Sequence, residues 1–241
     1  DIRLDDAVDV TGASSAEVRR LAFLNAAFET GIENPMDAAI LAAGERDGFS
    51  AEGISKIDEI PYDFVRRRLT IVVEEPDSPG RHRIITKGAF ASVASICDTV
   101  RENGSVRSLD ASARLRLEAY LRQQSEAGIR VLALAERTLL AKALYEIEDE
   151  SNLTFLGFLL FRDPPKPDAE KTIRDLRALG VAAKIITGDN RYVTAHLARQ
   201  IGLDPGAMIT GGELASMKDE ALWHRAPLTD LFAEIEATGS G

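Results

Sequence analysis

A short polar turn, Thr187-Gly188-Asp189, follows an apolar run and precedes an expected helix. In open parallel sheets, ligands bind beyond the carboxyl ends of the strands, so this turn could meet an anion such as phosphate. Gly188 would let the backbone approach that anion, and Asn190 could cap a helix whose free N–H groups suit it. A strand–turn–helix connection with polar turn residues and no ligand explains the same residues. On spacing alone, this is the better explanation.

Lys87 and Gly88 stand between an expected strand and an expected helix. A point charge, a glycine and helix-terminal N–H groups together fit a nucleotide phosphate or the edge of a base. A lysine at a strand end is, however, usually just solvated. The sequence contains neither G-x-x-x-x-G-K-[ST] nor G-x-G-x-x-G, so any nucleotide must be held without a glycine cradle.

Aromatic residues stand beside a basic run in the segment Pro61–Arg68. The face of Tyr62 or Phe64 could stack on a purine, and the arginines that follow could meet phosphate. The alternative is that the aromatic side chains lie in the core and the arginines pair with nearby carboxylates. For Phe64 we expect the core.

Two more charged residues stand in places that demand an explanation. Arg130 enters an apolar strand, where a charge needs either a structural carboxylate or a ligand phosphate as its partner. Asp37 follows Asn34-Pro35 early in an expected helix, where a carboxylate is favoured in any case. No spacing of Ser, His and Asp indicates a nucleophilic triad. One cysteine and three scattered histidines argue against a Cys/His zinc site, and we expect no protein-bound metal.

Capping and turn signals divide the chain into elements. Ser14 and Glu17 form a capping box that predicts the start of the first helix, and Pro35 suits the start of the second. The segment Pro76–Gly80 has the composition of a hairpin turn. We expect further helices over 89–98, 111–127, 168–179 and 191–201, and extended or strand segments over 54–60, 69–73, 83–86, 130–135, 153–161, 181–186 and 208–210.

The character of the chain changes at Asp163-Pro164-Pro165-Lys166-Pro167, a stiff joint at which we place a domain boundary. Before it, strands cluster with helices, which predicts an α+β domain. After it, helices and strands alternate, which predicts a parallel doubly wound sheet. This second part has too few strands for a complete sheet and looks truncated, and residues 238–241 resemble an artificial tail.

Composition excludes several classes of protein. The formal net charge of −10, from 29 basic and 39 acidic residues, argues against a nucleic-acid binder. The single cysteine, Cys97, excludes an internal disulfide framework and indicates a reducing compartment. The longest apolar run, Phe155–Phe161, is far shorter than the ~20 residues of a membrane helix. No signal peptide is expected, because acidic residues occupy the start of the chain.

Taken together, the motifs resemble the cytoplasmic catalytic region of P-type cation-transporting ATPases over nearly the whole chain. Each motif is weak alone, but six in the family's order are specific. They are Asn34-Pro35-Met36-Asp37, Pro61-Tyr62, Lys87-Gly88-Ala89, Arg130 in an R-V-L-A-L strand, Asp163-Pro164-Pro165 and Thr187-Gly188-Asp189. The segments Ile57–Arg68 and Phe155–Lys166 look closest to the bacterial magnesium-transporting branch.

The resemblance implies two domains. Residues 1–163 would be the nucleotide-binding domain, an antiparallel sheet flanked by helices. Residues 164–241 would be a truncated part of the phosphorylation domain, an incomplete haloacid-dehalogenase-like Rossmann segment. ATP, with its Mg²⁺, would be the ligand.

The resemblance also implies roles for single residues. Tyr62 matches the aromatic residue that stacks on adenine, and Lys87 with Gly88 lines the same pocket. Asp37 matches an acidic residue near the adenine amino group, and Arg130 matches an arginine that contacts the ATP phosphates. The family usually has Phe at the position of Tyr62 and often Glu at that of Asp37. The shorter Asp would make a longer or water-mediated hydrogen bond.

In the second domain, the resemblance assigns Thr187, Gly188 and Asp189 to the γ-phosphate site and Asp163 to the hinge. The family's phosphorylated aspartate lies in D-K-T-G-T, and its distal magnesium site in G-D-G-x-N-D; neither string occurs in this sequence. We therefore expect the 241 residues to bind ATP or ADP weakly without turning it over.

The parent protein would couple ATP hydrolysis, through an aspartyl-phosphate, to cation transport, with Mg²⁺ as the ion. It would act at the cytoplasmic face of the bacterial inner membrane, and the present chain would be soluble, with the parent's other cytoplasmic and transmembrane domains as partners and no nucleic acid. One alternative is a freestanding haloacid-dehalogenase-like phosphatase with a large cap, although the acidic residues near the start do not follow the apolar strand it requires. Another is a non-catalytic nucleotide-sensing or docking module.

Overall fold

The computed structural model describes residues 2–31 and 34–235, so the tail expected at 238–241 lies outside the described residues. The chain forms two compact units. The first comprises residues up to Leu121 together with Val131–Arg162, and the second comprises Arg122–Arg130 together with the residues from Asp163 onward.

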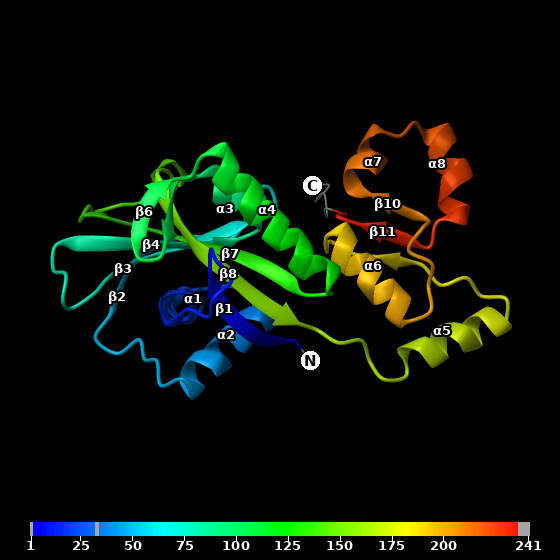
Figure 1. The fold of residues 1–241 in the computed structure, drawn as a ribbon, viewed down its shortest axis with the longest axis horizontal. Helices are drawn as coiled ribbons and strands as arrows, with labels where there is room; N and C mark the ends of the chain where they lie inside the picture. Colours follow the sequence, from blue (N-terminus) through cyan, green and yellow to red (C-terminus); the bar gives the residue numbers. More distant parts are fainter. Residues whose placement is uncertain (1, 32–33, 236–241) are drawn as a thin grey trace. The chain divides into compact units, whose positions relative to one another are not determined.

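An eight-stranded sheet is the centre of the first unit (Figure 1). Its strands are β1 (Arg3–Asp9), β2 (Ser55–Ile60), β3 (Arg68–Glu74), β4 (Arg81–Gly88), β5 (Cys97–Glu102), β6 (Ser105–Ser108), β7 (Arg130–Leu140) and β8 (Leu153–Arg162). The order is β2-β3-β4-β7-β8-β5-β6, and β1 pairs with β8 off this path. Because β5 runs parallel to β8, the sheet is mixed, and the expectation of a purely antiparallel sheet is wrong in this pair.

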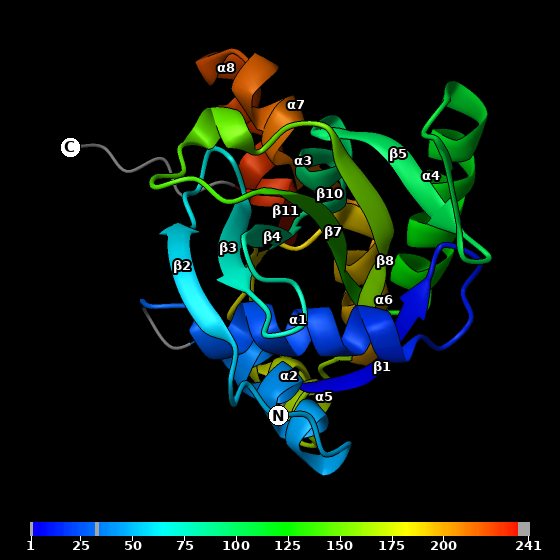
Figure 2. The ribbon, with the colours of Figure 1, turned by 90° about the vertical axis from the view of Figure 1, so that its left-hand side faces the viewer.

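The helices beside this sheet are α1 (Ala16–Phe28), α2 (Pro35–Arg46), α3 (Phe90–Ser95) and α4 (Ala111–Glu126). A 3₁₀ turn covers Ile147–Asp149. Figure 2 shows α1 lying across the strands, where it packs against β1, β4 and β8 while α2 packs against α1. The cap of α1 is Ser15, whose hydroxyl accepts from the Val18 N–H; the expected cap, Ser14, instead hydrogen-bonds to Asp6. Among the described residues, no helix has the length and apolar character needed to cross a membrane.

The core of the first unit lies on both faces of the sheet. Leu21 and Leu24 of α1 are fully buried in one apolar cluster with Ile71, Ile85 and Phe161. A second group is aromatic, with rings in successive contact: Phe90, Tyr120, Phe155 and Phe158. Strands β1 and β8 approach so closely that a Cβ on Gly157 would lie 1.9 Å from the Val8 carbonyl oxygen, so this position requires glycine.

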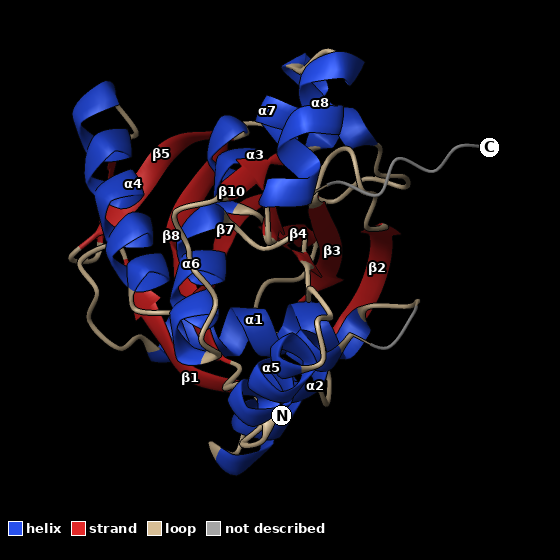
Figure 3. Ribbon diagram, turned by 90° about the vertical axis from the view of Figure 1, so that its right-hand side faces the viewer, coloured by secondary structure: helices blue, strands red, loops and turns tan. Residues whose placement is uncertain are grey.

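The second unit combines short strands with helices (Figure 3). Strands β9 (Ile185–Ile186), β10 (Met208–Thr210) and β11 (Leu231–Ala233) pair in parallel in the order β10-β11-β9. Its helices are α5 (Ala169–Ala178), α6 (Arg191–Gln200), α7 (Gly211–Ser216) and α8 (Asp219–Arg225), and a 3₁₀ turn covers Ala226–Leu228. The predicted parallel pairing is confirmed, but only the last two residues of the strand expected over 181–186 form β9.

The segment after β4 differs most from the sequence-based expectation. The helix expected over 89–98 ends at Ser95, and Cys97 begins β5. Strands β5 and β6 form a hairpin around Asn103-Gly104, whose φ angles of 50° and 75° are the positive values that a type I′ turn needs. An Asn-Gly pair between two extended segments is a hairpin signal, so the sequence did contain this information.

The aromatic core predicts a contrast between two Phe→Ala substitutions. Phe158 is fully buried, and its truncation should lower the free energy of unfolding by about 3–5 kcal/mol because it leaves a cavity among packed rings. Phe64 is 70% exposed, so Phe64→Ala should cost less than about 1 kcal/mol. Urea denaturation followed by circular dichroism measures both, and equal losses would contradict the packing described here.

Candidate functional site

Lys87 is buried at the end of β4, with only 5% of its surface exposed. Its ammonium group contacts the Asp37 carboxylate directly and lies 3.5 Å from Oε2 of Glu29. Asp37 is in the first turn of α2, which Asn34 caps, and Glu29 directly follows α1. The alternative of a simply solvated Lys87 is therefore wrong, because β4 and the adjoining ends of two helices enclose it.

This three-residue cluster has more acidic than basic groups. Burial of the Glu29 carboxyl raises its pKa to about 7, and the neighbouring Asp37 carboxylate adds to the effect, while Lys87 acts in the opposite direction. In the part of the chain that the structure describes, Oδ2 of Asp37 is buried without a hydrogen-bond partner. An unpaired buried oxygen is costly, so a hydrogen-bond donor that reached this atom would be favourable.

A cavity of about 510 Å³ lies beside the cluster, at the end of α1 and the start of α2. Glu29 and Asp37 are among the residues that line it, and Ala26, Ala38 and Leu41 contribute apolar surface. Its volume lies within the usual range of roughly 300–1,000 Å³ for small-molecule pockets. Mostly apolar walls with a few polar groups suit a flat, partly polar ligand.

Two aromatic side chains lie on the loop that joins β2 to β3, residues Pro61–Arg67, which we call the aromatic loop. Tyr62 is 48% exposed and Phe64 is 70% exposed, and their rings meet edge to face with centroids 5.6 Å apart. The expectation that Phe64 lies in the core is thus wrong. Because its ring is not enclosed by the protein, Tyr62 has surface available for stacking.

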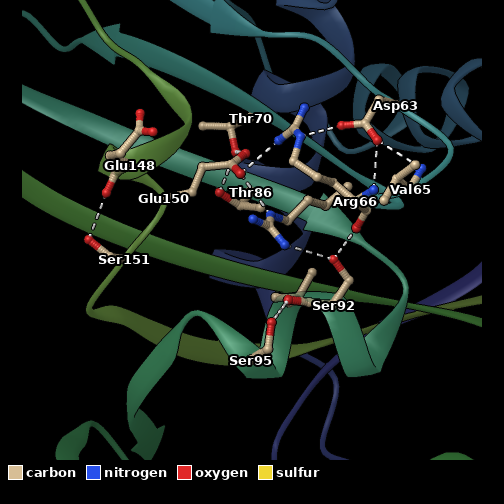
Figure 4. Close-up of polar contacts among 12 residues, drawn as sticks. Asp63, Val65, Arg66, Thr70, Thr86, Ser92, Ser95, Glu148, Glu150 and Ser151 are labelled. Carbon is tan, nitrogen blue, oxygen red and sulfur yellow. Dashed lines mark hydrogen bonds and ion pairs between the residues drawn. The ribbon is translucent and has the colours of Figure 1, made fainter.

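Ion pairs hold the aromatic loop in place (Figure 4). Arg66 contacts the carboxylate of Asp63 within the loop and that of Glu150, which lies just before β8. The N–H groups of Val65 and Arg66 donate to Oδ1 of Asp63, and the Arg66 N–H is the main reason why the pKa of Asp63 is lowered. The alternative in which the arginines pair with carboxylates is confirmed for Arg66.

Gly88 has a packing role at the end of β4. It pairs with Arg68 across the β3–β4 ladder, and a Cβ at this position would lie 2.4 Å from the carbonyl oxygen of Arg67. The same carbonyl accepts the N–H of Ala89 at 3.0 Å. The absence of a side chain therefore lets the end of the aromatic loop lie against the end of β4.

The other predicted site residues come together in the second unit. Arg130 donates to Oδ2 of Asp163 at 2.6 Å and to Oδ2 of Asp189 at 2.8 Å. Thr187 and Asp189 hydrogen-bond to each other across Gly188, and Asn190 caps α6 as predicted. Of the two partners considered for Arg130, the structure shows carboxylates, both of which the sequence had singled out for other reasons.

Sequence reasoning missed two residues of the first unit, Glu29 and Glu150. Glu29 is notable only as an acidic residue at the end of an amphipathic helix, and its partner Lys87 is 58 positions away. Glu150 lies among acidic residues, which is typical of a solvated segment, and its partner Arg66 is 84 positions away. Tyr62 and Lys87, which the sequence placed in one pocket, are not among the described residues that line the cavity beside Asp37.

Comparisons with known proteins agree on one family. A sequence profile described as "P-type ATPase, cytoplasmic domain N" matches residues 21–168. Over 97% of its length the chain is 34% identical to "Magnesium-transporting ATPase, P-type 1" of Escherichia coli (strain K12) and 38% identical to a protein of the same name from Salmonella typhimurium (strain LT2). It is 30% identical, over 84% of its length, to "Calcium-transporting ATPase" of Bacillus subtilis. The chain spans about a quarter of these relatives, 26%, 26% and 23% of their respective lengths.

The raised pKa of Glu29 predicts how stability depends on pH. The folded state binds this proton more tightly than the unfolded state, whose pKa is near 4.5, so the stabilisation is complete below pH 4.5 and is lost as the pH rises through about 7. Glu29→Gln cannot ionise and should remove this dependence, a difference of about 1 kcal/mol after allowance for solvent screening. Urea denaturation between pH 4 and 8 measures it.

The matched control for this experiment is Glu45→Gln, because Glu45 is an exposed carboxyl on α2. Its stability curve should run parallel to that of the unmodified chain. A Glu29→Gln curve that is also parallel would show that the Glu29 proton is not linked to folding.

Proposed function

Because the chain belongs to the P-type ATPase family, through the cytoplasmic domain N that residues 21–168 match, we propose that its first unit binds ATP or ADP. The observation that carries this proposal is the buried cluster of Lys87, Asp37 and Glu29, with its unpartnered carboxylate oxygen beside a cavity of about 510 Å³. A nucleotide base has an apolar face, which could lie against the apolar walls of the cavity. It also has N–H donors, which could pair with the free carboxylate oxygen.

Each residue of the proposed site has a distinct part in nucleotide binding. Oδ2 of Asp37 would accept a hydrogen bond from the amino group of adenine, and Lys87 holds that carboxylate through its other oxygen. The half-exposed ring of Tyr62 would stack on the purine. Gly88 lets the aromatic loop lie against β4. Mg²⁺ would arrive with the nucleotide and be held by its phosphates.

We propose that the second unit is part of the phosphorylation domain, with a haloacid-dehalogenase-like Rossmann fold. Its parallel strands, with Thr187-Gly188-Asp189 directly after β9, support this assignment. In this proposal Thr187, Gly188 and Asp189 serve the γ-phosphate, Asp163 lies at the hinge, and Arg130 contacts ATP phosphates. Since Asp163 and Asp189 already engage the Arg130 guanidinium, a phosphate would compete with these carboxylates.

The whole protein, of which this chain corresponds to about a quarter by comparison with its relatives, is proposed to be an ion-translocating ATPase. It would couple ATP hydrolysis, through an aspartyl-phosphate, to cation transport across the bacterial inner membrane. Identities of 34–38% to proteins named magnesium-transporting, against 30% to one named calcium-transporting, favour Mg²⁺ as the ion. Its remaining cytoplasmic and transmembrane domains would be the partners of this chain.

Nucleotide binding can be tested at Tyr62. Tyr62→Ala should weaken ATP binding about tenfold, because stacking of a base on an aromatic ring contributes roughly 1–3 kcal/mol. Tyr62→Phe keeps the ring and should bind as the unmodified chain does. Isothermal titration calorimetry at millimolar ATP measures all three dissociation constants. Equal affinities for all three, or no binding at all, would overturn the proposal.

Turnover is a separate test. Neither D-K-T-G-T nor G-D-G-x-N-D occurs in the 241 residues, so we expect no phosphoenzyme and no phosphate release above the spontaneous rate. Incubation with γ-labelled ATP, followed by acid precipitation and phosphate assay, measures both on a preparation shown to bind ATP. Phosphate release that disappears in Asp189→Asn would instead favour the freestanding phosphatase.

A further inference from the structure

Glu150 is a fully buried carboxylate in the connection between β7 and β8. Its Oε2 accepts from Nη1 of Arg66 at 2.7 Å and from Nε of Arg68 at 2.8 Å, and its Oε1 accepts from the hydroxyl of Thr70 at 2.6 Å. Thr70 in turn hydrogen-bonds to Thr86 across the β3–β4 pair at 2.7 Å. Glu150 is thus fixed to β3, through Thr70 to β4, and to the residues that lead into β3.

The aromatic loop depends on Glu150 through Arg66. The Arg66 guanidinium donates to the carbonyl oxygen of Pro61 and contacts the carboxylate of Asp63, the two residues on either side of Tyr62. The carbonyl of Arg66 accepts from the Ser92 hydroxyl, which also accepts from Arg68. Figure 4 shows Arg66 between Asp63 and Glu150. One side chain therefore joins both flanks of Tyr62 to a single buried anion.

The charges explain why this arrangement is specific. Arg66 and Arg68 are largely enclosed, with side-chain exposures of 14% and 12%, so both cations need the Glu150 charge close by. Removing the Glu150 charge would leave Arg66 paired with Asp63, whose side chain is 42% exposed, and this weaker compensation would drive the cation toward water. If Arg66 turned to solvent, it would release its bond to the Pro61 carbonyl and its contact with Asp63, and Tyr62 would lose its fixed direction.

We propose that Glu150 is a positioning residue for nucleotide binding: through Arg66 it fixes the aromatic loop in the conformation that presents the ring of Tyr62 to a purine. The inference rests on the proposed function, since it assumes that Tyr62 stacks on the ligand. Glu150 itself touches no ligand. Its effect is to remove, before binding, the conformational freedom that a loose loop would otherwise lose on binding.

A double-mutant cycle on the 241-residue chain tests this inference. Glu150→Gln keeps the side-chain shape and removes the charge; it should weaken ATP binding about three- to tenfold, measured by calorimetry. In the Tyr62→Ala background the same change should matter less than twofold, because there is no ring left to position. The matched control is Glu148→Gln, an exposed carboxyl in the same connection, which should bind ATP normally.

The outcomes separate the inference from the proposed function. A loss of affinity that is equal with and without the Tyr62 ring would mean a general structural role, and it would overturn the inference. Normal binding by Glu150→Gln would also overturn it, provided that Tyr62→Ala binds weakly. If Tyr62→Ala binds normally, the proposed function itself fails.

A second variant approaches the same link from the loop. Arg66→Lys keeps the charge but loses the fork that reaches Pro61, Asp63 and Glu150 together, so it should match Glu150→Gln in affinity. It decides the question if Glu150→Gln does not fold. Aromatic NMR of the nucleotide-free chain gives an independent readout: the Tyr62 ring signals should shift in both variants and not in Glu148→Gln. Unmoved signals would contradict the positioning role.

Discussion

Burial of charged side chains at the end of the β3–β4 pair is the constraint on which the candidate site depends. Side chains alternate between the faces of a sheet, so Lys87 and Thr86 serve opposite faces. On one face, Asp37 and Glu29 pair with Lys87. On the other face, Glu150 contacts Thr70, Arg66 and Arg68. Since an unpaired buried charge is very costly, the ends of α1 and α2 and the β7–β8 connection must all converge here.

The elements that the sequence predicted well are those with local signals. Pro35 begins α2 and Asn190 caps α6, because each signal acts within one turn of its own helix. The mixed character of the sheet was not predictable in the same way. It arises because β5 joins β8 in parallel, a pairing of residues more than 50 positions apart that no local pattern encodes.

The candidate site shows the same limit at the level of side chains. Residue type and spacing singled out Asp37, Lys87 and Tyr62, but the direct contact between Asp37 and Lys87 spans 50 positions. Phe64 was expected in the core because of its apolar ring; the loop instead exposes it, since Asp63 and Arg66 make a tight polar turn that directs the neighbouring side chains outward. Glu150 acquires its role only through the fold, because it is one of several acidic residues close together in the sequence.

The two carboxylate oxygens of Asp37 differ in their partners, and this difference matters for the proposed adenine ligand. Lys87 engages Oδ1, and Oδ2 keeps its lone pairs, so a ligand can bind without breaking a buried ion pair. A carboxylate oxygen can only accept, so it favours the amino group of adenine over the carbonyl oxygen that guanine carries at the same ring position. A site that keeps its cation paired and offers one free acceptor therefore selects for a base that donates. This selectivity requires no glycine cradle, because it comes from the buried charges themselves.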